Sequence, residues 1–396
     1  MTAPRAVAFV TVFDLKGHSG SNLATRALID ALAARDGIDL VLLAPEPADG
    51  TDLRAIWPGI DWIPLPQRSG RAIFWHLATA RRVRVRLREL FQDKAPDIVA
   101  VRLGYFFVPS AFLFPRPGCQ LVLLVRGSLR VPLSGLGALG TLAQHVMRRM
   151  TFAVARRADR LLFAFAAAVD EWRRLVPEER IAVIPNGADM SAFPLISKEQ
   201  ARAELRDSGG PELSGQVVGF AGSLRERHCL EQLVRACALL SGRSRAPELL
   251  MVGDGPVRPS LEALATELGI HDRVHFVGRV PHPEVAVRLA ACDLLYGLVD
   301  ATSPSNPIKV YEGLATGRPV VTSRQPELLF VERERLGVIV DSTSVEAVAR
   351  GLEEGLALDW TAADTARARS YIASNHSWDT LARAILESPA AGQHES

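Results

Sequence analysis

Short apolar runs rich in Val, Ile, Leu and Phe alternate along this chain with longer segments in which apolar residues recur at helical spacing. Strands of a parallel sheet that is covered by helices are buried on both faces and are therefore apolar throughout, so the alternation predicts an α/β fold. Two series of about six strands are expected. The first comprises residues 6–13, 38–44, 97–102, 120–125, 160–164 and 181–184, and the second comprises residues 216–221, 248–252, 273–277, 293–296, 319–322 and 337–340.

A turn separates the two series. The segment IPNGADMSAF, residues 184–193, contains Pro, Asn and Gly in succession, which is typical of a connection and not of a regular element. A chain of 396 residues also exceeds the usual size of one hydrophobic core. We therefore predict a first domain over residues 1–187 and a second over residues 188–377, with a last helix at about 378–390 after a break in the helical pattern at residues 374–377.

The composition places the chain among globular proteins. Hydrophobic residues make up 48% and charged residues 23% of it, which is enough to bury a core in each domain. The formal net charge of +2 gives no global case for nucleic-acid binding, and no apolar run approaches the length of a membrane span. The first residues resemble a core strand more than a leader peptide, and the four cysteines show no C-x-x-C spacing. We expect a cytoplasmic protein with buried, reduced thiols.

One segment is locally basic. Residues 81–88 contain five arginines, and this spacing fits the solvated face of an ordinary helix. It also fits a surface that contacts an anionic membrane or an acidic acceptor. The sequence leaves both interpretations open, so peripheral membrane contact through Arg81–Arg88 is a hypothesis at this stage.

In open parallel sheets, ligands bind beyond the carboxyl ends of the strands, so the loops that leave the strands carry most of the functional signal. The first such loop, residues 13–22, contains Gly17 and Gly20. Their spacing does not match the dinucleotide fingerprint G-x-G-x-x-G, which disfavours a nicotinamide cofactor. The loop either caps the following helix or contacts an anion or sugar, and Gly20 is a candidate for that contact.

Two further loops lie in the second series. Gly222, Ser223, Arg225 and His228 follow its first strand, and they combine a glycine turn with positive charge where a diphosphate could bind. The alternative is a solvated charged loop. Gly253 begins a similar turn, VGDGP, which is a weak signal by itself.

The segment SPSNPIKVYEGLATGRPVV, residues 303–321, has a more specific pattern. Prolines disfavour helix at the residue before them and suit a first helical turn, so a helix should begin at Pro307 or Ile308, with Asn306 as its N-cap. The N–H groups at this helix start favour anions, and Lys309 adds a full charge. Glu312, one turn later, can accept hydrogen bonds from ribose hydroxyls; alternatively, Lys309 and Glu312 form a surface ion pair.

These segments, in this order, resemble glycosyltransferase family 4, the retaining nucleotide-sugar transferases of the GT-B fold. The resemblance covers nearly the whole chain, and the matching motifs are IPNGADMSAF, FAGSLRERH, LLMVGDGP, VHFVGRVPHPEV, KVYEGLATGRPVV and SNHSWDTLA. It implies two facing Rossmann-like domains with parallel sheets and an interdomain cleft. The first domain would hold the acceptor, the second the nucleotide sugar, and the last helix would return to the first domain.

The resemblance also implies roles for individual residues. Gly222, Ser223 and Arg225 would line the diphosphate site, and His228 stands where many members have a lysine. Gly278, Arg279 and Val280 would flank the base, Glu312 would hold the ribose, and Arg225 and Lys309 would stabilise the leaving diphosphate. The backbone after Asn306, at Pro307 and Ile308, would meet the phosphates.

Two positions depart from the family pattern. Pro304 occupies the place of the first glutamate in the frequent E-x7-E pair, and Arg126 replaces the usual histidine of the first domain. Arg126 is nevertheless a candidate catalytic residue.

The leading hypothesis is metal-independent, retaining transfer from a UDP-, GDP- or ADP-sugar to a hydroxyl of a glycan or lipid-linked acceptor, without a further cofactor. Alternatives are a catalytically silent nucleotide-sugar or glycan-binding partner and a GT-B nucleotide-sugar epimerase. The missing fingerprint leaves a nicotinamide-dependent dehydrogenase as the least favoured interpretation.

Overall fold

The computed structural model describes residues 4–17, 19–67, 72–93, 95–103, 118–126, 137–170, 172–242, 246–300 and 305–387. By its internal contacts the chain divides into two units. The first unit comprises Met1–Pro185 and Trp378–Ser396, and the second comprises Asn186–Ser377. Each unit contains one parallel sheet, so the predicted α/β class is confirmed.

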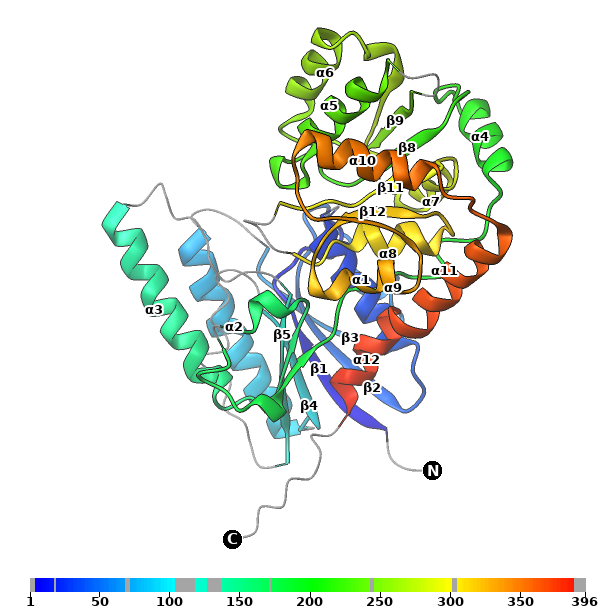
Figure 1. Ribbon diagram of the computed structural model, residues 1–396. Helices are drawn as coiled ribbons and strands as arrows, with labels where there is room; N and C mark the ends of the chain where they lie inside the picture. Colours follow the sequence, from blue (N-terminus) through cyan, green and yellow to red (C-terminus); the bar gives the residue numbers. More distant parts are fainter. Residues whose placement is uncertain are drawn as a thin grey trace. The chain divides into compact units, whose positions relative to one another are not determined.

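The first unit is built on a seven-stranded sheet (Figure 1). Its strands are β1 (Arg5–Val10), β2 (Ile38–Pro45), β3 (Asp61–Leu65), β4 (Ile98–Arg102), β5 (Gln120–Val125), β6 (Arg160–Phe163) and β7 (Ile181–Val183). They lie in the order β3-β2-β1-β4-β5-β6-β7, and all neighbours pair in parallel. The prediction of about six strands was therefore one short.

The missed strand is β3, with the sequence DWIPL. Its proline lacks a backbone N–H and cannot donate to a ladder on both sides, which argues against a central strand. The structure places β3 at the edge of the sheet, where one side needs no partner strand. The first predicted strand was also too long, because β1 ends at Val10 and the chain turns at Phe13, whose N–H donates to Thr11 Oγ1 at 3.2 Å.

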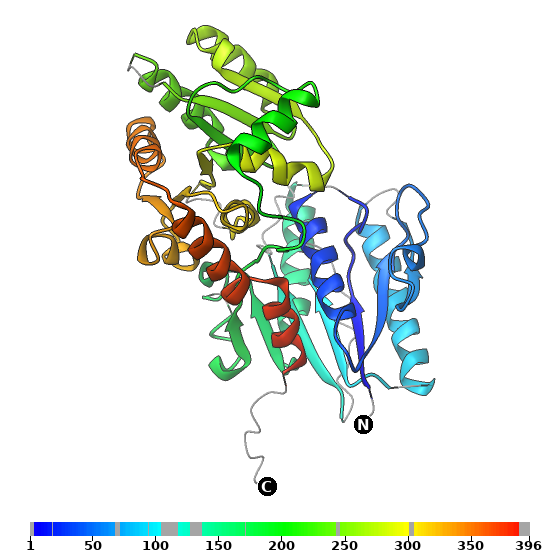
Figure 2. The ribbon, with the colours of Figure 1, turned by 90° about the vertical axis from the view of Figure 1, so that its right-hand side faces the viewer.

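Four α-helices belong to the first unit as far as the structure describes it: α1 (Gly20–Ala33), α2 (Ala72–Asp93), α3 (Gly137–Ala155) and α12 (Trp378–Leu386). Val83 and Leu87 of α2 and Val154 of α3 share a buried cluster with one face of the sheet. Figure 2 shows α1 and α12 side by side on the sheet, and a 2.6 Å ion pair joins Arg35, just after the end of α1, to Asp379 of α12.

In the part that the structure describes, the second unit has a six-stranded sheet, and the sequence predicted about six strands. They are β8 (Val217–Ala221), β9 (Glu248–Val252), β10 (Val274–Gly278), β11 (Leu294–Tyr296), β12 (Val320–Ser323) and β13 (Gly337–Val340), in the order β10-β9-β8-β11-β12-β13. Its α-helices are α4 (Lys198–Asp207), α5 (Leu230–Leu240), α6 (Arg258–Glu267), α7 (His282–Ala290), α8 (Ile308–Ala315), α9 (Phe330–Arg333), α10 (Val345–Leu356) and α11 (Ala362–Asn375).

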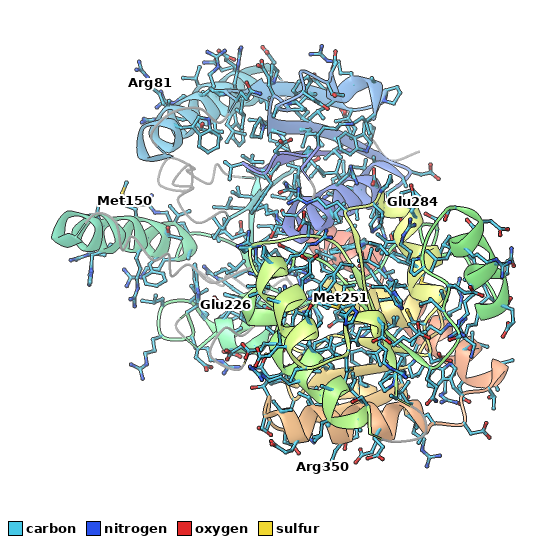
Figure 3. The ribbon with its side chains drawn as sticks, turned by 90° about the horizontal axis from the view of Figure 1, so that it is seen from above. Arg81, Met150, Glu226, Met251, Glu284 and Arg350 are labelled. Carbon is cyan, nitrogen blue, oxygen red and sulfur yellow. The ribbon has the colours of Figure 1, made fainter. Side chains whose placement is uncertain are left out.

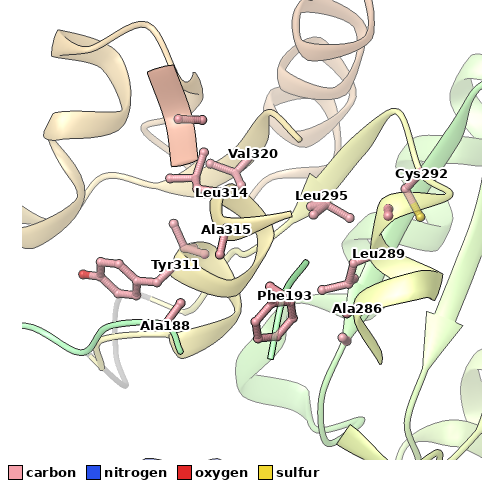
Figure 4. Close-up of a cluster of buried hydrophobic side chains, with 14 of the residues drawn as sticks. Ala188, Phe193, Ala286, Leu289, Cys292, Leu295, Tyr311, Leu314, Ala315 and Val320 are labelled. Atoms are coloured by element: carbon pink, nitrogen blue, oxygen red, sulfur yellow. The ribbon is translucent and has the colours of Figure 1, made fainter. Parts of the chain in front are cut away.

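Buried clusters lie on both faces of this second sheet. One cluster joins α5, α6 and α10 to the sheet, and the other joins α7, α8 and α11 to it. Figure 4 shows part of the latter, where Tyr311, Leu314 and Ala315 of α8 lie near Val320. The packing fixes the orientation of α8 and hence of the side chains at its first turn.

The cysteines behave largely as predicted. All four are free thiols, and three of them, Cys229, Cys237 and Cys292, are buried. Burial raises the pKa of the Cys292 thiol to about 12, so it stays protonated. Cys119 differs from the prediction because it is only half-buried.

The strand order reverses once in each sheet, between β1 and β4 in the first unit and between β8 and β11 in the second. At such a point the loops leaving the two strands run to opposite faces, and a crevice opens between them. Within each unit, this edge of the sheet is where a ligand site is expected.

Candidate functional site

Three glycines stand side by side at the carboxyl ends of β8, β9 and β10. The Gly222 N–H donates to Val252 O at 2.9 Å, and the Gly253 N–H donates to Gly278 O at 2.7 Å. All three have positive φ angles, 145°, 128° and 72°. A Cβ on Gly253 would lie 2.0 Å from Gly222 O, so no side chain fits there. The row presents backbone without side chains, which a ligand can approach closely.

Lys309 lies beside this row. Its Nζ is 3.1 Å from His228 Nδ1 and 5.0 Å from the ring centroid of Phe220. A Cβ on Gly222 would lie 3.5 Å from Lys309 Cε. Lys309 comes from α8 and His228 from the short 3-10 helix Glu226–His228 after β8. The loops on the two sides of the switch point therefore meet at these side chains.

The environment of this pair alters its charge. Burial, followed by the neighbouring charges of Lys309, Arg227 and Arg225, lowers the pKa of His228 to about 2, so the imidazole is neutral. Burial, with the charge of Arg227, lowers the pKa of Lys309 to about 7. Lys309 thus carries only part of a charge near neutral pH while the site holds no anion, and a full charge on Lys309 at bound phosphates stays a prediction. An anion at the glycine row would restore it.

Arg225 and Ser223 flank the same row. Arg225 is exposed, and its Nε donates to Ser223 Oγ at 3.2 Å. Arg227 is also exposed, and its Nε lies 3.4 Å from His228 Nε2. The predicted charged loop therefore presents exposed guanidinium groups around the half-buried Lys309.

Helix α8 begins as predicted but is capped differently. Its first residue is Ile308, and its N-cap is Pro307, which has no side chain to accept a hydrogen bond. The prediction that Asn306 is the N-cap was wrong. Among the described residues no side chain caps this end, and the Val310 N–H donates to Pro307 O at 3.2 Å. The N–H groups before Val310 are the ones that can meet an anion.

Asn306 is instead part of a buried hydrogen-bond network. Its Oδ1 accepts from Asn186 N–H, its backbone carbonyl accepts from Asn186 Nδ2, and its own Nδ2 donates to Tyr311 OH, each at 2.7 Å. The network ties the IPNGADMSAF segment to the loop before α8. Gly187 is needed beside it, because a Cβ there would lie 2.3 Å from His376 O.

Glu312 lies one turn after Lys309 but does not pair with it. Its Oε1 is 3.2 Å from His282 Nε2, and both side chains are half-buried. Among the described residues no ion pair joins Lys309 to Glu312, so the surface-pair alternative is wrong. Sequence reasoning missed His282, although it lies at the first position of α7 within the quoted VHFVGRVPHPEV motif. His282 fixes the orientation of the carboxylate and leaves its second oxygen for a ligand.

Gly278, Arg279 and Val280 follow β10 at the same sheet edge. The ladder between β9 and β10 shifts register between Phe276 and Gly278, which makes a bulge at the end of the strand. Arg279 is exposed and Val280 packs against the core. This segment therefore exposes the Arg279 side chain beside a bulged strand end.

The remaining predicted residues, Gly20 and Arg126, belong to the first unit. Gly20 is the exposed first residue of α1, behind the N-cap Ser19. Arg126 follows β5, and its Nη1 donates to Ile184 O at 2.5 Å. Pro304, at the position of the missing glutamate, lies outside the described residues. Arg102, which the sequence did not single out, is buried near Arg126.

Comparison with known proteins agrees with this architecture. Residues 19–187 match the family described as Glycosyl transferase 4-like domain, and residues 215–357 match Glycosyl transferases group 1. A D-inositol 3-phosphate glycosyltransferase of Corynebacterium urealyticum is 32% identical over 216 residues, which cover 52% of this chain and 50% of the relative. The chain thus spans about half the length of this relative.

Two further proteins extend the comparison. A GDP-mannose-dependent alpha-(1-6)-phosphatidylinositol monomannoside mannosyltransferase of Mycobacterium tuberculosis is 29% identical over 325 residues, 77% of this chain and 78% of the relative. The solved structure of HepE from Anabaena in complex with UDP-glucose has a TM-score of 0.71 at 17% identity and covers 96% of this chain and 98% of that one.

Two Rossmann-like units, each with a single switch point, define the GT-B architecture. With the two family matches over most of the chain, they identify the class: the protein belongs to the GT4-type GT-B glycosyltransferases.

Proposed function

We propose that this protein transfers a sugar from a nucleotide diphosphate sugar to a hydroxyl of a glycan or lipid-linked glycan, with retention at the anomeric carbon. The observation that carries the proposal is the group formed by the glycine row and Lys309. Gly222 and Gly253 allow phosphate oxygens to approach the backbone, and Lys309 is placed to gain a full charge when they do.

In this proposal the second unit binds the donor. The diphosphate lies against the glycine row and the start of α8, the ribose hydroxyls donate to Glu312, and the base lies along Gly278–Val280. The HepE structure with UDP-glucose and the GDP-mannose-dependent relative support a nucleotide sugar as donor, without deciding the base.

The difficult step is departure of the nucleoside diphosphate, because negative charge grows on the leaving oxygen as the C1–O bond breaks. Lys309, Arg225 and the uncapped start of α8 are proposed to stabilise that charge. In a front-face reaction the acceptor oxygen forms the new bond to C1 while its proton passes to the leaving phosphate oxygen. No carboxylate nucleophile is required, unlike in retaining hydrolases.

The transfer is proposed to need no metal ion, since Lys309 and Arg225 supply positive charge at the phosphates. Turnover should then persist in a chelator. Loss of activity in EDTA that Mg²⁺ restores would contradict this part of the proposal.

In this proposal the basic face of α2 brings the protein to a membrane surface that carries the acceptor. Arg81, Arg82 and Arg88 are exposed, whereas Val83 and Leu87 face the core, and Figure 3 shows Arg81 on the outside of the helix. No helix in the described part of the chain is long and apolar enough to span a bilayer.

The test is thermal unfolding of the full chain with UDP, GDP and ADP, followed by assays of donor hydrolysis and acceptor glycosylation with the sugars of the best-binding nucleotide. A ligand that binds only the folded state raises its stability by mass action. Stabilisation by one nucleotide together with turnover supports the proposal. Stabilisation without hydrolysis or transfer would indicate a silent binding partner instead.

A further inference from the structure

Arg102 is a buried cation with few hydrogen bonds. It is the last residue of β4 and only 2% exposed, and its Nε and Nη1 have no partner among the described residues. Its guanidinium lies over the ring of Phe13, 4.8 Å from the centroid. Burying a charge without a full set of hydrogen bonds is costly, and an aromatic face offsets only part of that cost. The fold therefore maintains an arrangement here that lowers its own stability.

A second arginine lies on the same side of the sheet. Arg102 pairs in register with Leu124 of β5, and side chains alternate between faces, so Arg126 points to the same face as Arg102. Burial, and then the charge of Arg126, lower the pKa of Arg102 to about 9, so it remains charged at neutral pH. Arg102 is buried and Arg126 is half-buried. Two neighbouring cations attract an anion, and the attraction is stronger where less water screens them.

The position of these arginines in the fold is that of a ligand site. Phe13 follows β1 and Arg102 ends β4, so they occupy the two sides of the switch point of the first sheet. With Phe13 over its face, the N–H groups on the edge of the Arg102 guanidinium remain for an acceptor. A guanidinium edge matches the oxygens of phosphate and carboxylate groups.

We propose that Arg102 and Arg126 form an oxyanion-binding subsite in the first unit, which holds a phosphate or carboxylate group of the acceptor. The assignment to the acceptor rests on the proposed function, since the second unit has its own groups for the donor diphosphate. The anion site itself does not depend on that function. With such a subsite, the acceptors are expected to carry an anionic group close to the hydroxyl that is glycosylated.

The first experiment uses inorganic phosphate as the probe. Thermal unfolding of the full chain is measured with increasing phosphate at constant ionic strength. The proteins compared are the wild type, Arg102→Met, Arg225→Gln and Arg82→Met. Arg82→Met is the matched control, because it removes an exposed arginine of the same unit. Phosphate should raise the midpoint of the wild type, Arg82→Met and Arg225→Gln. Arg102→Met should lose this shift, with at least tenfold weaker phosphate binding by titration calorimetry.

The unliganded midpoint separates a binding role from a structural one. Methionine fills a similar volume without a charge, so Arg102→Met without phosphate should unfold at the same temperature as the wild type or higher. A lower midpoint would mean that Arg102 stabilises the fold through contacts, and would overturn the proposal. An unchanged phosphate shift in Arg102→Met, or no shift in the wild type, would overturn it as well.

A second experiment distinguishes this inference from the proposed function. Nucleoside diphosphate at saturation should leave the phosphate shift in place, and Arg102→Met should keep the full nucleotide shift. Loss of the phosphate shift in Arg225→Gln or under saturating nucleotide would place the anion in the second unit and contradict the inference. If phosphate shifts the unfolding midpoint through Arg102 but no nucleotide shifts it, the anion site is supported and the proposed function is contradicted.

Discussion

Lys309 Nζ lies 3.1 Å from Nδ1 of a histidine, His228, which is only 6% exposed and stays neutral. A protonated imidazole there would repel the ammonium group, whereas a neutral one can accept a hydrogen bond from it. Burial nevertheless lowers the pKa of Lys309 to about 7. The pair is therefore suited to a site where Lys309 becomes fully protonated when an anion binds.

Donor binding should consequently take up a proton at Lys309. Above pH 7 the free lysine is largely neutral, and a bound diphosphate favours its charged form. The affinity for the stabilising nucleoside diphosphate should fall as the pH rises from 7.5 to 9.5, by up to about tenfold per pH unit. Titration calorimetry in buffers of different ionisation enthalpy measures the proton uptake directly.

Two substitutions at this position provide the controls. Arg is charged at all these pH values, so Lys309→Arg should remove most of the proton uptake and flatten the pH dependence. Lys309→Met should weaken binding by about 10- to 100-fold, the value of one or two charge-assisted hydrogen bonds. Proton uptake of the wild-type size in Lys309→Met would show that another group titrates.

Glu312→Gln tests the ribose contact. The carboxylate, oriented by His282, is proposed to accept from both ribose hydroxyls, and an amide offers one oxygen and a donor instead. Nucleotide affinity should drop about tenfold or more. A 2′,3′-dideoxy nucleotide lacks the hydroxyls, so it should bind the wild type and the variant equally; a similar loss with both nucleotides would contradict the assignment.

Gly253→Ala should destabilise the second unit. A Cβ at this position would lie 2.0 Å from Gly222 O, and the φ of 128° is unfavourable for any other residue. Strain and steric overlap together should cost about 3 kcal/mol of unfolding free energy. Gly242→Ala is the control, because no atom of the described residues lies within 4 Å of the position that its Cβ would take. Chemical denaturation of both variants measures the difference, and equal midpoints would refute the close packing of the row.

Acid should destabilise the protein partly through His376. Its ring lies 4.7 Å from Phe330 and 4.9 Å from Tyr311, and burial, with the charge of Arg333, lowers its pKa to about 4. Between pH 4 and pH 6.5, His376 is protonated in the unfolded chain but neutral in the native protein. The free energy of unfolding therefore has its full contribution from His376 above pH 6.5 and decreases as the pH drops towards 4. The contribution lost at pH 5 is about 2 kcal/mol.

His376→Phe keeps the ring contacts and cannot titrate. Its unfolding free energy should therefore decrease less than that of the wild type between pH 7 and pH 5, in urea denaturation followed at both pH values. An identical decrease in the two proteins would assign the acid sensitivity to other groups.

The basic face of α2 predicts salt-sensitive binding to anionic liposomes. Arg81, Arg82 and Arg88 are exposed, and each arginine near a charged surface contributes about 1 kcal/mol to binding. Replacing these three by Gln should abolish cosedimentation with such liposomes at low salt. The same three-residue change should leave nucleotide stabilisation intact. Binding that persists, or that does not depend on salt, would favour the simple solvated face.

The sequence by itself determined the two α/β units. Strands buried on both faces must be continuously apolar, and such apolar runs are visible in the sequence without knowledge of the tertiary structure. Its prolines and glycines also predicted where α8 begins and where the backbone is left open to a ligand. Local chemistry was sufficient for these features, since proline geometry and the absence of a Cβ act within a few residues.

Only the tertiary structure decided what each polar side chain contacts. Asn306 is a residue type that favours the N-cap position, yet its side-chain amide forms hydrogen bonds with Asn186 and Tyr311 instead. Lys309 is an ordinary lysine in the sequence, and its lowered pKa arises from burial against residues some 80 positions away. Arg102 looks like the polar end of a strand until the fold encloses it beside Arg126. Burial and long-range contacts set charge and hydrogen bonding, and no local pattern encodes them.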